Sequence, residues 1–68
     1  MFKKGTKFEV VKNGIVGVIG DSFFMGDVHR CYAVTFYEGD RIYYCCPFFE
    51  DTIKSHVKSG IYKIIEEV

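Results

Sequence analysis

The stretch Lys12-Asn13-Gly14-Ile15-Val16-Gly17-Val18-Ile19-Gly20 decides the fold that we expect for this chain. Asn13-Gly14 is the strongest short signal for a β-hairpin, because both residues tolerate the positive φ that a type I′ turn requires. The run from Ile15 to Ile19 is β-branched apart from Gly17, which predicts a buried strand. A glycine inside such a strand usually marks a bulge or a sharp bend, so we expect a barrel corner at Gly17.

The segments on either side of this stretch differ in pattern. Thr6 to Val11 alternates polar and apolar residues, with Phe8 and Val10 on one face, which predicts a half-buried strand that pairs back onto it. Gly20 to Asp27 begins and ends like a loop, yet it holds Phe23-Phe24-Met25 in its middle. This loop either folds back as a lid on the core or presents the three side chains to a partner.

Two further alternating runs follow, from His29 to Phe36 and from Arg41 to Cys46. Opposed residues of an antiparallel pair point to the same side of a sheet. Matching the apolar faces pairs Phe36 with Ile42, Val34 with Tyr44 and Tyr32 with Cys46. On the other face the same register places Thr35 by Tyr43 and Ala33 by Cys45. It also leaves Glu38-Gly39-Asp40 as a three-residue loop. Pro47 is expected to stop the second strand, because it cannot donate a backbone hydrogen bond.

The last third of the chain predicts one short helix and a closing strand. Phe49, Ile53 and Val57 recur every four residues, acidic residues come early, and Gly60 is placed to end the helix. A shorter 3₁₀ turn between Glu50 and Lys54 is the alternative. Ile61 to Glu66 alternates again and reads as a strand.

Length and composition limit the class of protein to which this chain can belong. Sixty-eight residues make one domain, residues 1–68, whose core is small, because a chain of this size buries only about 60% of its unfolded surface. Its 49% hydrophobic and 18% aromatic content exclude a disordered chain and leave some rings for the surface. Nine basic residues balance nine acidic ones, which argues against a dedicated binder of polyanions.

The sequence also indicates a location. No apolar run approaches the length of about 18–20 residues that spans a membrane. The N-terminus lacks the apolar core of a signal peptide. Three cysteines form an odd number without framework spacing, so we expect a reducing, cytoplasmic setting.

Three kinds of chemical site do not fit the sequence, and no cofactor, metal or catalytic residue is expected. A phosphate loop needs its glycines between a strand and a helix, whereas Gly14, Gly17 and Gly20 lie in a β-branched run. Cys45 and Cys46 are adjacent in a strand and point to opposite faces, so they do not converge on zinc with Cys31 and His29. Nothing orients His29 or His56 beside a cysteine as the base of a nucleophile pair. We expect Cys46 to be buried and the other two cysteines to be partly exposed. In the expected register, Cys31 and Cys45 lie diagonally across two strands on the outer face, where an adventitious disulfide can form.

The pattern as a whole resembles the SH3-like barrel, with five short strands and a helical turn between the fourth and fifth. The Gly14-x-x-Gly17-x-Ile19 run, followed by Tyr32-Ala33-Val34 and then Gly39-Asp40, looks like small KOW- or Tudor-type members of that fold. The resemblance implies a mostly β, five-stranded barrel of the kind found free-standing in bacteria and their phages. What such relatives bind differs widely, so the fold alone does not choose a function.

Two functional hypotheses follow. The first is a non-enzymatic module that binds another protein or a second copy of itself, because exposed aromatic and methionine side chains favour protein interfaces. Its anchors would be Phe23, Phe24, Met25, Tyr37 and Tyr43. The second is a nucleic-acid-binding barrel, whose tyrosines stack on bases while basic residues contact phosphate. Its basic residues would be Lys3, Lys4, Lys7, Lys12 and Arg30.

Overall fold

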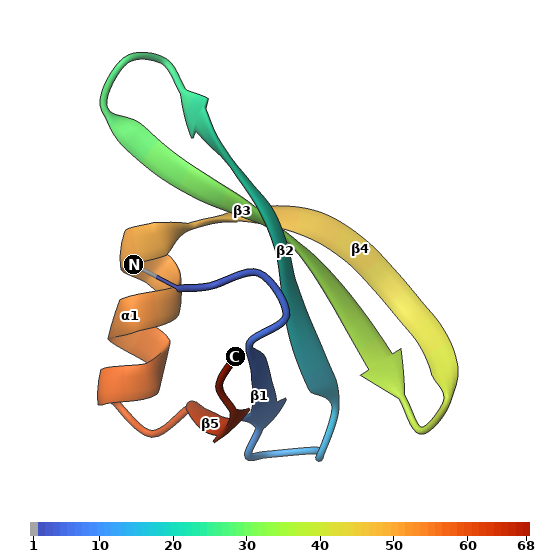
Figure 1. Ribbon diagram of the computed structural model, residues 1–68. Helices are drawn as coiled ribbons and strands as arrows, with labels where there is room; N and C mark the ends of the chain where they lie inside the picture. The colour runs from blue at the N-terminus through green and yellow to red at the C-terminus, as the bar shows by residue number, and fades with distance from the viewer. Residues whose placement is uncertain (1) are drawn as a thin grey trace.

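Five antiparallel strands in one open sheet and a single helix make up the part of the chain that the computed structural model describes, residues 2–68 (Figure 1). In chain order the elements are β1 (Lys7–Val10), β2 (Val16–Met25), β3 (His29–Glu38), β4 (Arg41–Phe49), α1 (Glu50–Lys58) and β5 (Tyr62–Glu66). The sheet order is β4-β3-β2-β1-β5. The predicted five strands, with the helix between the fourth and fifth, are therefore confirmed.

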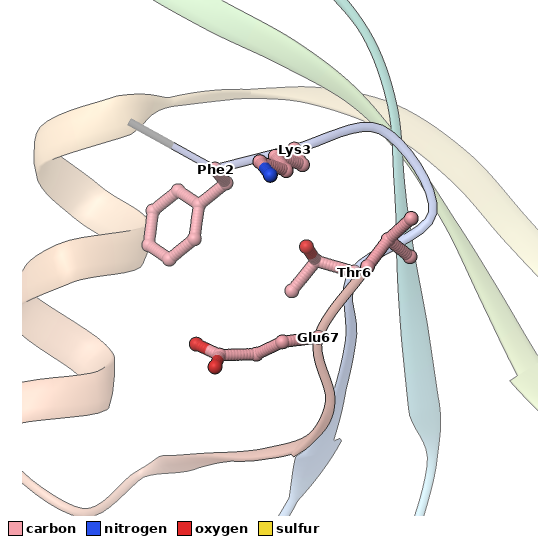
Figure 2. A pocket seen from close by; sticks show the side chains of 5 residues that line it. Phe2, Lys3, Thr6 and Glu67 are labelled. Carbon is pink, nitrogen blue, oxygen red and sulfur yellow. The ribbon is translucent and has the colours of Figure 1, made fainter.

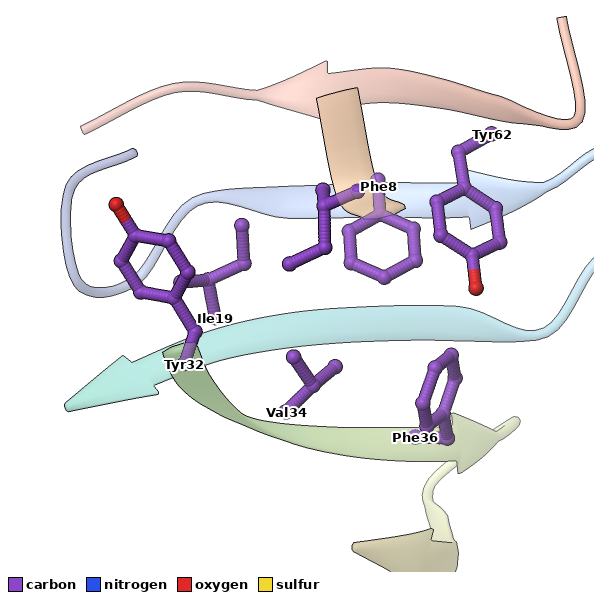
Figure 3. Close-up of a cluster of buried hydrophobic side chains, with 7 residues drawn as sticks. Phe8, Ile19, Tyr32, Val34, Phe36 and Tyr62 are labelled. Atoms are coloured by element: carbon purple, nitrogen blue, oxygen red, sulfur yellow. The ribbon is translucent and has the colours of Figure 1, made fainter. Parts of the chain in front are cut away.

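The core lies between the inner face of this sheet and α1 (Figure 3). The predicted inward positions of β1 and β3 are confirmed: Phe8, Tyr32, Val34 and Phe36 are buried, and Val10 is half-buried against the core. The core residues are Phe8, Ile19, Tyr32, Val34, Phe36, Ile53 and Tyr62. Aromatic contacts organise it: the ring of Phe8 stacks on Tyr62 at a centroid distance of 4.3 Å and meets Phe36 edge-on at 5.8 Å.

Gly17 is explained by packing rather than by a bend. It pairs regularly with Phe8 and Phe36 on its two sides. A Cβ at Gly17 would lie 2.3 Å from Cζ of Phe8, so only glycine leaves room for that ring. The predicted corner at Gly17 is wrong, because the irregularity in β2 comes after Ile19.

The turn between β1 and β2 also differs from the prediction. Gly14 has a positive φ of 76°, but no non-glycine residue among those described does, so Asn13-Gly14 is not a type I′ turn. The loop instead closes over four residues, since Val10 N–H donates to the Ile15 carbonyl at 2.7 Å. The Asn13 side chain accepts a hydrogen bond from Ile15 N–H at 3.0 Å, a local contact that asparagine makes readily in turns.

The segment predicted as a loop, Gly20 to Asp27, is mostly strand. A bulge between Ile19 and Ser22 lets β2 continue to Met25 and pair with β3 as far as His29. The paired ends of β2 and β3, residues 22–32, form a hairpin that projects from the body in Figure 1, and we call it the arm. Phe23, Phe24 and Met25 are exposed on it, so the lid alternative is wrong.

The register of β3 and β4 is shifted by two residues from the prediction. Phe36 pairs with Tyr44, Val34 with Cys46 and Tyr32 with Phe48. On the outer face, Thr35 and Ala33 accordingly pair with Cys45 and Pro47. The shift arises because the hairpin turns through Gly39-Asp40 alone, with a positive φ at Gly39, and Tyr43 is then accommodated by a bulge. Local alternation does not reveal a bulge, so matching the apolar faces gives a register two residues away from the observed one.

Pro47 does not end β4, which continues to Phe49. The strand lies at the edge of the sheet, where the missing N–H of a proline is tolerated because no further strand requires it.

The helix is confirmed and the 3₁₀ alternative is wrong. Ile53 is buried against the core, and Ser59 caps the helix with Gly60 following at a φ of 85°. Gly60 N–H donates to the Val57 carbonyl, and Ile61 N–H donates to the His56 carbonyl. These two hydrogen bonds together define a Schellman motif.

Candidate protein-binding surface

The outer face of the sheet divides into two halves of different chemistry. On β1 and β5 four outward positions are charged, Lys7, Glu9, Lys63 and Glu66, and the apolar Ile65 is exposed beside them. On β2, β3 and β4 the outward positions carry no charge. These residues are Val16, Val18, Phe23, Cys31, Ala33, Thr35, Tyr37, Ile42, Cys45, Pro47 and Phe49, and we call them the charge-free face.

Strand pairing makes the charge-free face continuous. Its rows cross the three strands from β2 to β4, because paired residues point to the same side. The rows are Val16–Tyr37–Ile42, Val18–Thr35–Cys45, Ala33–Pro47 and Phe23–Cys31–Phe49. With a rise of about 3.3 Å per residue and strands about 4.8 Å apart, the face measures about 23 by 10 Å between strand axes.

One ionic group lies on β2 beside the Ala33–Pro47 row, at the margin of the face away from β4. Asp21 lies in the β2 bulge, and its carboxylate pairs with Lys4 Nζ at 2.9 Å. His29 lies beyond the last row, where its ring meets Phe49 at a centroid distance of 5.5 Å. At the opposite end, a shallow depression of about 400 Å³ is lined by Lys7, Val16, Val18, Tyr37 and Gly39.

The structure places three of the five predicted anchors on one side of the sheet, at its two ends. Phe23 and Tyr37 belong to the charge-free face, and Met25 extends it along the arm, paired with His29. Phe24 instead pairs with Arg30 and projects from the opposite side, where the guanidinium lies 4.8 Å from the ring centroid. Phe24 is 58% exposed, so it contributes little to the core.

Tyr43 lies apart from the other anchors. It occupies the β4 bulge, and its ring meets that of Tyr44 edge-on at 5.0 Å. Both tyrosines line an opening of about 380 Å³ between β4 and the start of β5, together with Val10, Asn13, Ile15, Phe36, His56, Ile61 and Tyr62. Burial raises the pKa of Tyr44 and of Tyr62 there.

The cysteines occupy other positions than predicted. Cys31 is 1% exposed, because it lies in a row between Phe23 and Phe49, whereas Cys45 is exposed and Cys46 is half-buried. All three are free, and the predicted diagonal of Cys31 and Cys45 is wrong, because the Ala33–Pro47 row lies between them. Burial, and then the neighbouring Cys45, raises the pKa of the Cys46 thiol. Within residues 2–68 no group of three or more His, Cys, Asp or Glu side chains is arranged to hold a metal ion.

The basic residues of the nucleic-acid hypothesis do not share one surface. Lys4 pairs with Asp21, and Lys7 Nζ lies 3.6 Å from Glu66 Oε2 across β1 and β5. Lys12 lies in the loop at the far end of β1, and Arg30 lies on the arm.

Lys3, the remaining basic residue of that set, lies where the two ends of the described chain meet. It lines a pocket of about 250 Å³ with Phe2, Thr6, Glu67 and Val68 (Figure 2). The pocket thus carries both a lysine and a glutamate, so it has no single charge with which to recognise an ion.

The residues of this surface that we did not predict are those misassigned by the register. Ile42 was expected to face the core, and Phe49 was expected on the inner stripe of the helix, but both are exposed on the charge-free face. One signal was available: from Cys31 to Tyr37 both faces of the alternation are uncharged. A strand with water on one side normally carries polar residues there.

In comparisons with protein families, curated proteins and solved structures, nothing matches this chain. Within the described residues, no helix has both the length and the apolar character needed to cross a membrane.

Proposed function

We propose that this chain is a small, non-enzymatic module of SH3-like barrel type that binds another protein through its charge-free face. The observation that carries the proposal is the contrast within one sheet. The outward positions of β1 and β5 are mostly charged, with Ile65 as the apolar exception, while those of β2, β3 and β4 carry no charge outside the β2 bulge. Contiguous apolar patches of more than a few hundred Å² mark interaction sites on soluble proteins.

The composition of the face supports a protein as the partner. Interface centres are depleted in charged residues and enriched in aromatic residues, and this face carries Phe23, Tyr37 and Phe49. A nucleic acid would instead need cations, which are paired or scattered on this molecule. The free cysteines fit a reducing compartment such as the cytoplasm.

Photo-crosslinking in the source cell tests this proposal. A benzophenone amino acid replaces Tyr37 on the charge-free face, and a matched variant carries it at Ile65 of β5, which is 48% exposed. We expect discrete, protease-sensitive adducts from position 37 and none from position 65. Equal labelling at both positions, or an adduct that nuclease removes, would contradict the proposal.

A further inference from the structure

We infer that the protein covering the charge-free face is a second copy of this chain, so that two sheets stack face to face about a two-fold axis. This inference rests on the proposed function, which requires only that some protein covers the face. The charge and the shape of the face favour a second copy, and the protection of the neighbouring sheet edge favours stacking over strand pairing.

The charge of the face favours self-association. A two-fold interface brings the same patch of both copies together, so a patch with charges of one sign would repel itself. This patch has no charge, and the chain has a formal net charge of zero, so two copies meet without long-range repulsion. Homodimer interfaces are also more apolar, at about 65% of their area, than interfaces between transient partners.

The shape of the face suits the stacking of two sheets. The sheet wraps around the core, so its outer face is the convex one (Figure 1). Small side chains, Ala33 and Thr35, occupy the middle of β3, while larger ones lie at both ends of the face, such as Phe49 and Ile42. Larger side chains at the ends and smaller ones in the middle make the convex outer surface flatter. Two flat sheet faces can stack about 10 Å apart with their side chains interdigitated.

The free edge next to the face is protected against strand pairing. β4 is an edge strand, but it contains Pro47, which has no N–H, and a bulge at Tyr43. Prolines and bulges are the devices by which edge strands avoid pairing with another chain. A second copy therefore meets the face of the sheet rather than extending it.

The size of the face predicts a weak dimer. A standard stable interface buries about 800 Å² on each partner. That area is about a sixth of the 4739 Å² that this chain exposes. The charge-free face measures only about 23 by 10 Å between strand axes. Because small interfaces belong to weak complexes, we expect a dissociation constant on the order of 10 µM.

Sedimentation velocity of the purified chain from about 1 µM to about 1 mM tests the inference, since this range brackets the expected constant. We expect the weight-average mass to approach twice 7.9 kDa as the concentration rises. Ile42→Lys places a charge on the face at a side chain that is 67% exposed and should weaken association at least about 30-fold. Ser55→Lys, on the exposed surface of α1, is the matched control and should dimerise like the natural chain. Circular dichroism checks that both variants fold.

Isotope-filtered NMR on an equal mixture of labelled and unlabelled chain shows which surface is involved. We expect intermolecular contacts to the methyl groups of Val18 and Ile42. Contacts from Ile65 or Val68 instead, or a monomer at 1 mM, would overturn the inference. A monomer that still yields adducts with a different protein at position 37 would leave the proposed function standing, whereas a monomer without adducts would overturn both.

Discussion

Tyr32 connects three parts of the chain through one buried hydroxyl. The side chain is 1% exposed, and its hydroxyl donates to Glu50 Oε2 at 2.7 Å, in the first turn of α1. It also accepts a hydrogen bond from Phe2 N–H at 3.0 Å. The Tyr32 hydrogen bond, with help from the ammonium of Lys54, lowers the pKa of Glu50 despite partial burial. Burial, and then the same bond, raises the pKa of Tyr32.

Tyr32→Phe should therefore destabilise the fold and change its response to acid. A hydrogen bond to a charged group contributes about 1.5–3 kcal/mol, so we expect a loss of about 2 kcal/mol at pH 7. Because the pKa of Glu50 is lower in the folded state, its contribution is present above the unfolded pKa of 4.5 and is lost as pH falls through the folded value. The variant should lose less stability than the natural chain between pH 7 and pH 3.

Urea denaturation at a series of pH values measures this effect. Tyr43→Phe removes a hydroxyl from an exposed ring and is the control. Parallel stability curves for the natural chain and Tyr32→Phe would contradict the role assigned to the bond. At alkaline pH, the raised pKa of Tyr32 means that this residue contributes its full stabilisation below its unfolded pKa of 10.0. That contribution is lost as the pH rises through the pKa of Tyr32 in the folded state.

The ring of Phe8 requires glycine at position 17, because it occupies the space that a Cβ would need. Gly17→Ala places a methyl group where that ring lies, and overpacking of this kind costs about 1–3 kcal/mol. The cost should fall in a Phe8→Leu background, where the ring is absent. Chemical denaturation of the two single variants and the double variant forms the test cycle, and strictly additive losses would show that the two positions do not interact.

At the scale of elements, the helix is the segment that local sequence specifies most completely. Its cap depends on Gly60, whose φ of 85° a side chain disfavours. We expect Gly60→Ala to lower the free energy of unfolding by about 1 kcal/mol. Ser59→Ala, at a negative φ of −84°, should change it by less than about 0.5 kcal/mol. Equal losses from both variants, measured by thermal unfolding, would rule out the cap as the cause.

The strands were predicted less completely than the helix. Alternation identified β1, β3 and β5 and the inward positions Phe8, Tyr32 and Val34, because the period of a strand is local. It missed the length of β2 and the pairing of β4, because both depend on bulges. A bulge forms where a neighbouring strand accommodates it, so no short window of sequence contains the information.

At the scale of the whole molecule, the arm and the body should differ in local stability. The arm carries exposed Phe24 and Met25 and adds no residue to the main core beyond Tyr32, whereas β3 crosses the core at Val34. In native-state hydrogen exchange of the monomer, we expect the amides of Phe24 and Arg30 to exchange by local opening. Those of Ile19 and Val34 should require global unfolding and exchange at least about 100-fold more slowly. Uniform protection would show that arm and body open as one unit.

The sequence by itself determined the mostly β class, the helix with its glycine cap, the existence of the fifth strand, and the inward residues of the first and third strands. These features follow from periodicity and from the φ preferences of single residues, which are local properties. Only the tertiary structure decided that Phe24 and Tyr43 lie away from Phe23 and Tyr37, and that Ile42 and Phe49 join the latter pair. The physical reason is that a face is made by register between strands distant in sequence, and a bulge shifts which side chains it presents.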